Sequence, residues 1–164
     1  MELINGTYWI PVATASKTIS QTPTVTAGAY TAGDAVGGLL TFAGAARYPG
    51  GGGVMKNVFI VDDAGQDAEL ELWLFNQTFT AIADNAAWSG VSEADLENCI
   101  GVVSTETSDQ GWMAAGTPSV CDIEVAKGYN LVGTSLFGQL VSPTDTPTFA
   151  ATDDVTVKVM LLQD

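Results

Sequence analysis

The stretch VMKNVFIVDDAGQDAELELWLF, residues 54–75, decides the fold of this chain. It opens with an almost continuous apolar run, turns at an Asp-Asp-Ala-Gly sequence, and continues into a run in which every second residue is leucine. Strand residues point alternately to the two faces of a sheet, so this pattern buries the leucines and exposes the glutamates between them. The stretch therefore predicts two antiparallel strands joined by a turn, Val54–Val61 and Ala68–Phe75.

The same alternation of strand-forming runs with Gly, Pro, Asp and Asn clusters extends over most of the chain. Ser92 and Asp95 form a capping-box pattern that predicts one short helix over Glu93–Glu97. We expect the last strand to be covered on both faces near its end, where Met160 and Leu162 are apolar. Further strands are predicted at Thr24–Tyr30, Val36–Phe42, Cys99–Thr105, Trp112–Ala114, Val120–Val125, Leu131–Val141 and Val155–Leu162.

About eight short strands without an internal repeat predict an all-β fold, an antiparallel two-sheet sandwich that is jelly-roll-like. Residues 1–22 differ from the rest, because three large residues are followed there by a Ser/Thr/Ala stretch without a clear period. We interpret residues 1–22 as an N-terminal arm or edge strand and residues 23–164 as the sandwich domain. Tyr8, Trp9 and Ile10 of the arm either reach a neighbour or cover the end of their own sandwich.

Targeting and cysteine patterns bear on the compartment. The N-terminal stretch lacks the order of a secretory signal, and no run approaches the ~18 apolar residues that a membrane span needs. We therefore expect synthesis in a cytoplasm and no membrane partner. Cys99 and Cys121 match neither a redox nor a zinc motif, so two buried thiols are expected in preference to a disulfide.

The charge of the chain is strongly acidic. Its 164 residues include 19 Asp and Glu against five Lys and Arg, which gives a net charge of −14. Binding to nucleic acid starts from Lys and Arg that displace counterions from phosphates, so we expect no nucleic-acid partner. The acidity serves solubility or meets a basic patch on a partner protein.

Catalytic chemistry has few candidates in this composition. The chain contains no histidine, which excludes Ser-His-Asp and Cys-His nucleophile systems and histidine-based metal sites. Carboxylates remain, yet their spacing selects no pair for glycoside hydrolysis. Asp62, Asp63 and Asp67 do not follow the EF-hand ligand order, and turn chemistry accounts for them. We expect a protein that is not an enzyme and has no metal site and no cofactor.

The tryptophans are the strongest candidates for partner contacts. Trp faces suit either a sugar platform or a protein interface. Trp73 lies on the polar side of its strand, which favours a subunit contact unless the second sheet or the arm covers it. The predicted interface residues are Tyr8, Trp9, Ile10, Trp73, Trp88 and Trp112.

Four segments of the chain resemble a family of small structural proteins of tailed bacteriophages. They are Tyr30–Asp34 (YTAGD), Val61–Phe75, Asp84–Ala87 and Leu162–Asp164. In that family a YTAGD turn opens the sandwich, an alternating strand precedes an Asp-Asn-Ala loop, and the chain stops at LQD. The resemblance covers about residues 22–164 and implies a virion component. Analogy with jelly-roll cement proteins of phage capsids suggests a decoration protein bound outside the shell.

The expected function is therefore a capsid decoration or cement protein, located on the outer capsid surface of the virion and acting through its arm and one sheet edge. Its expected partners are the major capsid protein and copies of itself, as a trimer or dimer. The alternative is a tail-associated carbohydrate-binding or host-adhesion module, in which Trp88 and Trp112 form a glycan face. A carboxylate-based glycan hydrolase would require a paired Asp/Glu cleft, which the sequence does not locate.

Overall fold

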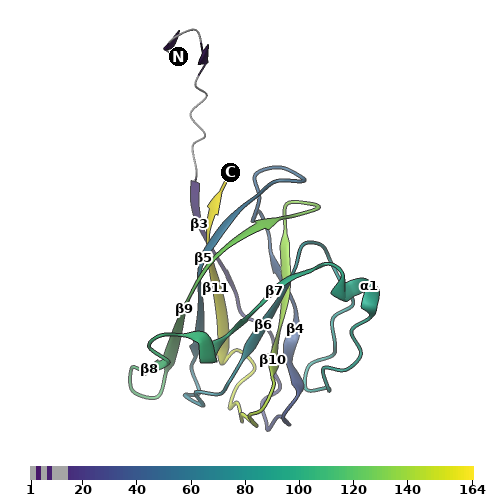
Figure 1. Cartoon of the computed structure of the whole chain (residues 1–164). Helices are drawn as coiled ribbons and strands as arrows, with labels where there is room; N and C mark the ends of the chain where they lie inside the picture. Colours follow the sequence, from purple (N-terminus) through teal and green to yellow (C-terminus); the bar gives the residue numbers. More distant parts are fainter. Residues whose placement is uncertain (1–2, 5–6, 9–14) are drawn as a thin grey trace.

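Two antiparallel sheets pack face to face in the computed structural model, which describes residues 3–4, 7–8 and 15–164 (Figure 1). The five-stranded sheet has the order β3-β11-β5-β9-β8, and the four-stranded sheet has the order β4-β10-β6-β7. A separate pair is formed by β1 (Leu3–Ile4) and β2 (Thr7–Tyr8). The strands of the five-stranded sheet are β3 Ala15–Gln21, β5 Gly52–Asp62, β8 Trp112–Ala114, β9 Ser119–Asn130 and β11 Val155–Gln163. Those of the four-stranded sheet are β4 Asp34–Phe42, β6 Glu71–Phe75, β7 Cys99–Ser104 and β10 Leu136–Ser142.

The topology is that of a double-sheet jelly roll. If the short β8 is set aside, the chain order of the strands is 1-8-3-6 in one sheet and 2-7-4-5 in the other. The first and last of these strands are neighbours, and most connections cross from one sheet to the other, as two interleaved Greek keys require. The predicted all-β sandwich is confirmed.

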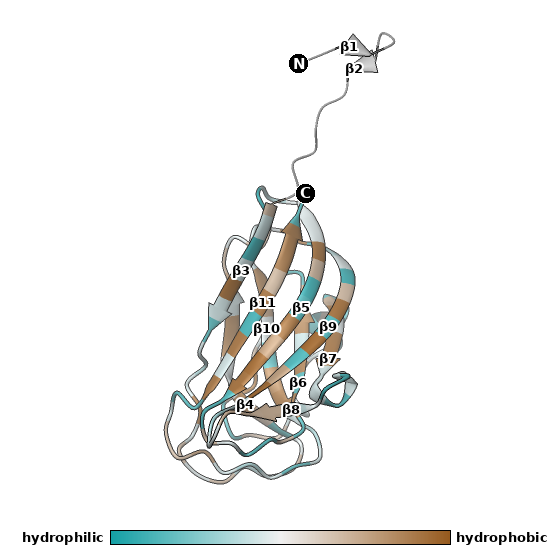
Figure 2. Cartoon of the chain, turned by 90° about the vertical axis from the view of Figure 1, so that its left-hand side faces the viewer, coloured by the Kyte–Doolittle hydropathy of each residue, from teal (hydrophilic) through white to brown (hydrophobic). Residues whose placement is uncertain are grey.

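Alternating residues of both sheets build the core, as the leucine pattern predicts. Leu72 and Leu74 of β6 are at most 2% exposed, and the inward apolar residues of β11 are at most 1% exposed. The expectation that β11 is covered on both faces at its end is wrong, because Met160 is 38% exposed and Leu162 is half-buried. Within the part of the chain that the structure describes, no strand or helix packs over this side of the five-stranded sheet (Figure 2).

Strand boundaries depart from the sequence prediction at three places. Thr24–Tyr30 is not a strand, because its backbone makes isolated bonds to residues 147–152 instead of a ladder, while Val25 and Tyr30 point into the core. The Ser/Thr-rich stretch before it forms β3, which pairs with β11 along its whole length. β10 begins only at Leu136, and β9 continues to Asn130.

Two of the four segments that carry the sequence resemblance, Tyr30–Asp34 and Asp84–Ala87, meet in the structure. Asp84 accepts hydrogen bonds from the Tyr30 hydroxyl and the Gly37 amide through Oδ1, and from the Thr26 hydroxyl through Oδ2, each at 2.6 Å. The YTAGD turn is closed by the amide of Thr31, which donates to the Asp34 carboxylate at 2.8 Å. Asp84 therefore fixes the start of the sandwich against the loop that follows β6.

That loop, residues 76–98, is here called the covering loop, because it lies across the outer side of the four-stranded sheet (Figure 1). Gln139 of β10 points outward yet is 0% exposed, since its amide donates to the Ile82 carbonyl and accepts from the Ile82 amide. Phe75 stacks on Phe79 at a centroid distance of 3.9 Å. The loop also contains α1 (Glu93–Leu96), whose N-cap is Ser92, so the short helix is confirmed with Glu97 as its C-cap.

Replacing Asp84 tests how much the junction of the two segments contributes to stability. Asp84→Ala leaves the Tyr30 hydroxyl and the Gly37 amide without their acceptor, so we expect a loss of about 3 kcal/mol in the free energy of unfolding. Urea denaturation followed by circular dichroism measures it. Asp153→Ala, at an exposed carboxylate, is the control and should change stability by less than about 0.5 kcal/mol. Equal effects of the two variants would contradict this role of Asp84.

Tyr129 ties the end of β9 to the loop after β4. Its hydroxyl donates to the Ala45 carbonyl at 2.6 Å, and its ring is 5% exposed. Burial raises the pKa of Tyr129 to about 12, and the Asp164 carboxylate acts in the same direction. The neutral phenol is thus the form that the fold favours.

Alkaline unfolding should therefore report on Tyr129. Its pKa is higher in the folded chain than the ~10 of an unfolded chain, so its stabilising effect is complete below pH 10 and is lost as the pH rises toward 12. We expect Tyr129→Phe to lose less stability than the wild type between pH 10 and 12, by up to ~2.7 kcal/mol. Tyr48→Phe, at a hydroxyl on a 55% exposed residue, should follow the wild-type curve, and coincident curves for all three proteins would refute the prediction.

Candidate interaction surface

The described residues offer surfaces for contact more than groups for catalysis. Among them, no set of three or more Cys, Asp or Glu side chains is arranged to hold a metal ion. Asp62, one of the aspartates considered for calcium, accepts hydrogen bonds from the amides of Ala64, Gln66 and Asp67, so its carboxylate closes a turn. None of the helices in the described ranges is long and apolar enough to cross a membrane.

The outer side of the five-stranded sheet, whose strands face the viewer in Figure 2, is here called the open face. It carries apolar side chains that the sandwich does not bury. Met113, Met160 and Val54 are 41%, 38% and 37% exposed. Strand registers place the outward residues in cross-strand rows, whose members are direct neighbours on one face. From β8 or β9 toward β3, the rows are Met113-Val120-Val61-Thr156, Asp122-Phe59-Lys158-Ser20, Glu124-Asn57-Met160-Thr18 and, from β5, Val54-Leu162-Ser16.

The five-stranded sheet differs in net charge from the rest of the chain. Its strands contain four lysines and three acidic residues, listed by position as Lys17, Lys56, Lys127, Lys158, Asp62, Asp122 and Glu124. The remainder of the chain therefore holds Arg47 and 16 of the 19 acidic residues. The strands of the five-stranded sheet thus have a net charge of +1 and the remainder of the chain −15, so a contact made through the open face escapes most of the repulsion that an acidic surface imposes.

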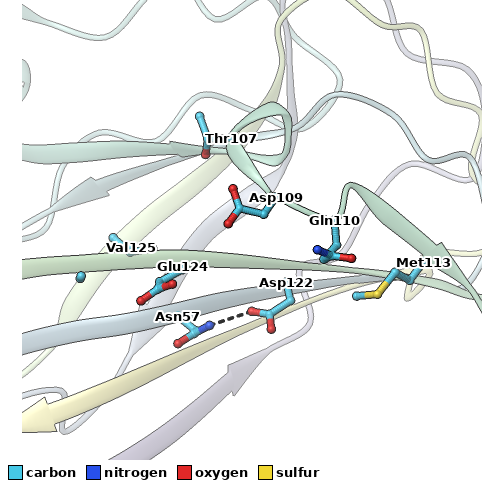
Figure 3. Close-up of a pocket in the computed structure, with 9 residues that line it drawn as sticks. Asn57, Thr107, Asp109, Gln110, Met113, Asp122, Glu124 and Val125 are labelled. Atoms are coloured by element: carbon cyan, nitrogen blue, oxygen red, sulfur yellow. Dashed lines mark hydrogen bonds between the residues drawn. The ribbon is translucent and has the colours of Figure 1, made fainter.

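A hollow of about 410 Å³ adjoins the open face. One wall comes from the connection between the 3₁₀ helix η1 (Thr105–Thr107) and β8, and includes Asp109 and Gln110 (Figure 3). The other comes from β5 and β9, where Asn57 donates to the Asp122 carboxylate at 2.8 Å. Three carboxylates and no basic group line the hollow, so it does not suit an anionic ligand.

The end of the sandwich where β3 begins and β11 stops, at the top of Figure 1, is here called the upper end. It carries a second group of exposed apolar residues. Tyr48 and Val132 are 55% and 59% exposed, the highest values among the large apolar residues. Their loops are joined by the Gly50 amide, which donates to the Val132 carbonyl at 3.2 Å. Arg47, the one arginine of the chain, is exposed beside them. Tyr and Arg are preferred residues at protein interfaces.

The predicted interface tryptophans lie in two separate places. Trp73 and Trp88 pack together on the outer side of the four-stranded sheet, with ring centroids 5.5 Å apart, and the Trp73 indole donates to Glu71. Trp112 lies in the other sheet, packs on the core and donates to the Ala68 carbonyl at 3.1 Å. A glycan face shared by Trp88 and Trp112 is therefore wrong, because the sandwich separates them.

The other predicted interface residues belong to the arm. Tyr8 contributes its backbone to β2, while Trp9 and Ile10 lie outside the described residues. The sequence analysis missed Tyr48 and Val132, which stand in Gly-rich loops without a periodic signal. It also missed the open face, whose signal was the second set of apolar residues in the last strand, interpreted there as buried.

Both cysteines are free, and they lie in different sheets. Cys121 of β9 is buried, and burial raises the pKa of its thiol, while Cys99 of β7 is half-buried. An inert thiol is thus expected at position 121.

Comparison of the chain with family models, with curated proteins and with solved structures finds no match.

The open face should tolerate polar substitution at little cost in stability. Met160→Thr replaces an outward residue, so we expect a change below about 0.5 kcal/mol in the unfolding free energy. Its neighbour Val159 is 0% exposed, and Val159→Thr buries a hydroxyl without a partner at a cost of about 1–3 kcal/mol. Urea denaturation at low protein concentration compares the two. A cost for Met160→Thr as large as that for Val159→Thr would mean that the open face is part of the core.

Proposed function

We propose that this chain is a structural protein of a tailed-bacteriophage virion, a decoration or cement protein on the outside of the capsid. One observation carries the proposal: the described surface of the jelly roll is equipped for contact, through an open sheet face and exposed apolar residues at the upper end. Jelly rolls are frequent in viral capsid and lectin domains. The phage-like segments at Tyr30–Asp34 and Asp84–Ala87 support the same assignment, since they are structurally joined.

The contact with the major capsid protein is assigned to the arm and the upper end. The arm enters the sandwich at Ala15, beside exposed Tyr48, Val132 and Arg47. An edge strand, β3, continues from it and presents unpaired backbone groups for strand addition. The net charge of −14 supports a location outside the shell, because packaged DNA would repel an acidic protein within the ~8 Å Debye length.

Decoration acts by mass action, since a protein that binds only the assembled lattice stabilises that lattice. Repetition of one weak site around a symmetry axis raises the avidity, so a homodimer or homotrimer on a local axis suits this function. Synthesis in the host cytoplasm precedes attachment.

A tail-associated carbohydrate-binding or host-adhesion module is the second candidate. The observation that favours it is the half-buried Trp73 and Trp88 pair, because paired indoles can stack on sugar rings. This candidate uses the covering-loop side of the molecule and predicts few copies in each virion.

The copy number per virion and its dependence on the arm test the proposal. We expect quantitative mass spectrometry of purified virions to give a ratio to the major capsid protein near one or a simple fraction of it. Because β3 belongs to the sheet, the informative truncation removes residues 1–14 and retains Ala15. The truncated chain should keep its circular dichroism spectrum and lose at least tenfold in capsid occupancy.

Two results would overturn the proposal. A handful of copies per virion would move the chain to the tail and favour the glycan-binding candidate. Undiminished occupancy by the folded, truncated chain would remove the arm from the capsid contact.

A further inference from the structure

The open face has a charge pattern that matches its own copy. β5 is the middle strand of the five, with β11 on one side and β9 on the other. Lys158 projects from β11, and Lys56 of β5 lines a shallow dent with Met160 and Leu162 on the β11 side. Asp122 and Glu124 project from β9. Positive charge thus lies on one side of the middle strand and negative charge on the other.

A twofold axis along β5 brings these opposite charges together. Rotation about that axis places β11 of one copy over β9 of a second copy. Each cross-strand row then faces the equivalent row of the second copy. In the row Asp122-Phe59-Lys158, Lys158 then meets Asp122 of the second copy on both flanks, and Phe59 meets its own equivalent on the axis. In the next row, Glu124 approaches the dent that contains Lys56 of the second copy.

We propose that the open face is the interface of a twofold-symmetric dimer, so that its occupant is a second copy of this chain. An isologous interface requires a patch that is complementary to itself under a twofold rotation, and the charge pattern of this face fulfils that condition. Apolar contacts add to these charge pairs, because Val61 and Val54 of β5 also meet their equivalents along the axis.

The area and the charge of the open face both fit a weak contact with a second copy of the chain. Fifteen outward positions in the four rows, at strand spacings of about 4.8 Å, give a patch of roughly 500 Å² per copy, the size of a weak, transient interface. A uniformly acidic partner would be repelled by Asp122 and Glu124, and a uniformly basic one by Lys56 and Lys158. Sixteen of the 19 acidic residues lie outside the strands of this sheet, and among them Asp109 borders the open face at the hollow.

The experiment is sedimentation equilibrium of the full chain over a concentration series at low and high salt. We expect a monomer–dimer equilibrium that weakens with salt. Lys158→Asp and Asp122→Lys should each raise the dissociation constant at least tenfold, because each places like charges together. The exchanged double variant, Lys158→Asp with Asp122→Lys, should return it to within about threefold of the wild type.

Matched controls separate this contact from net charge and from misfolding. Lys127→Asp makes the same charge change as Lys158→Asp, but the Lys127 amine lies against Gly101 of the other sheet and away from the open face, so dimerisation should persist. Phe59→Glu places two carboxylates on the axis and should abolish the dimer. Thermal unfolding of each variant at low concentration verifies the fold.

Three outcomes would overturn the inference: a wild-type chain that stays monomeric at millimolar concentration, a double variant that does not recover, or equal weakening by Lys127→Asp. The inference concerns the isolated chain and is independent of any role in a virion, so it stands or fails separately from the capsid experiment.

Discussion

The register of β11 against β5 is the constraint on which the rest of the structure depends. β11 pairs on one side with the first long strand of the chain and on the other with the middle strand of its sheet. Because side chains alternate between faces, this one register sends Val157 and Val159 into the core and Lys158 and Met160 to the outside. A slip by one residue would bury the lysine and expose the valines, so core formation and surface chemistry are determined together.

The two outer faces of the sandwich differ in how far the described residues cover them. The covering loop seals the four-stranded sheet and bonds both ends of the buried Gln139 amide, which also donates to the Gly37 carbonyl. The five-stranded sheet receives no such cover from the described residues and keeps Met160 exposed. The polar residues that share its outer face, Lys158 and Asp122 among them, keep this surface compatible with water.

Sequence patterns predicted the sheets better than their surroundings. The leucine alternation before Phe75 and the cap at Ser92 are local signals, and both correspond to what the structure contains. Thr24–Tyr30 has strand-like composition but lies beside a loop, and only the tertiary fold determines that its backbone partners are isolated. The exposure of Met160 could not be predicted from the sequence either. Alternation shows whether a residue points outward or inward, but it does not show what packs over that face. The separation of Trp88 from Trp112 depends on which strands share a sheet, which no local pattern records.

The pairing of Ala15 with Gln163 also sets the mechanical behaviour of the fold. In an antiparallel pair the hydrogen bonds run perpendicular to the strands. A force that pulls the start of β3 away from the end of β11 therefore opens their ladder one bond at a time, like a zip. A force between the start of β3 and the opposite end of the sandwich loads all of these bonds at once, in shear. The sandwich thus yields easily to a force applied between Ala15 and Gln163, which are paired at the same end. It resists a force transmitted along its length.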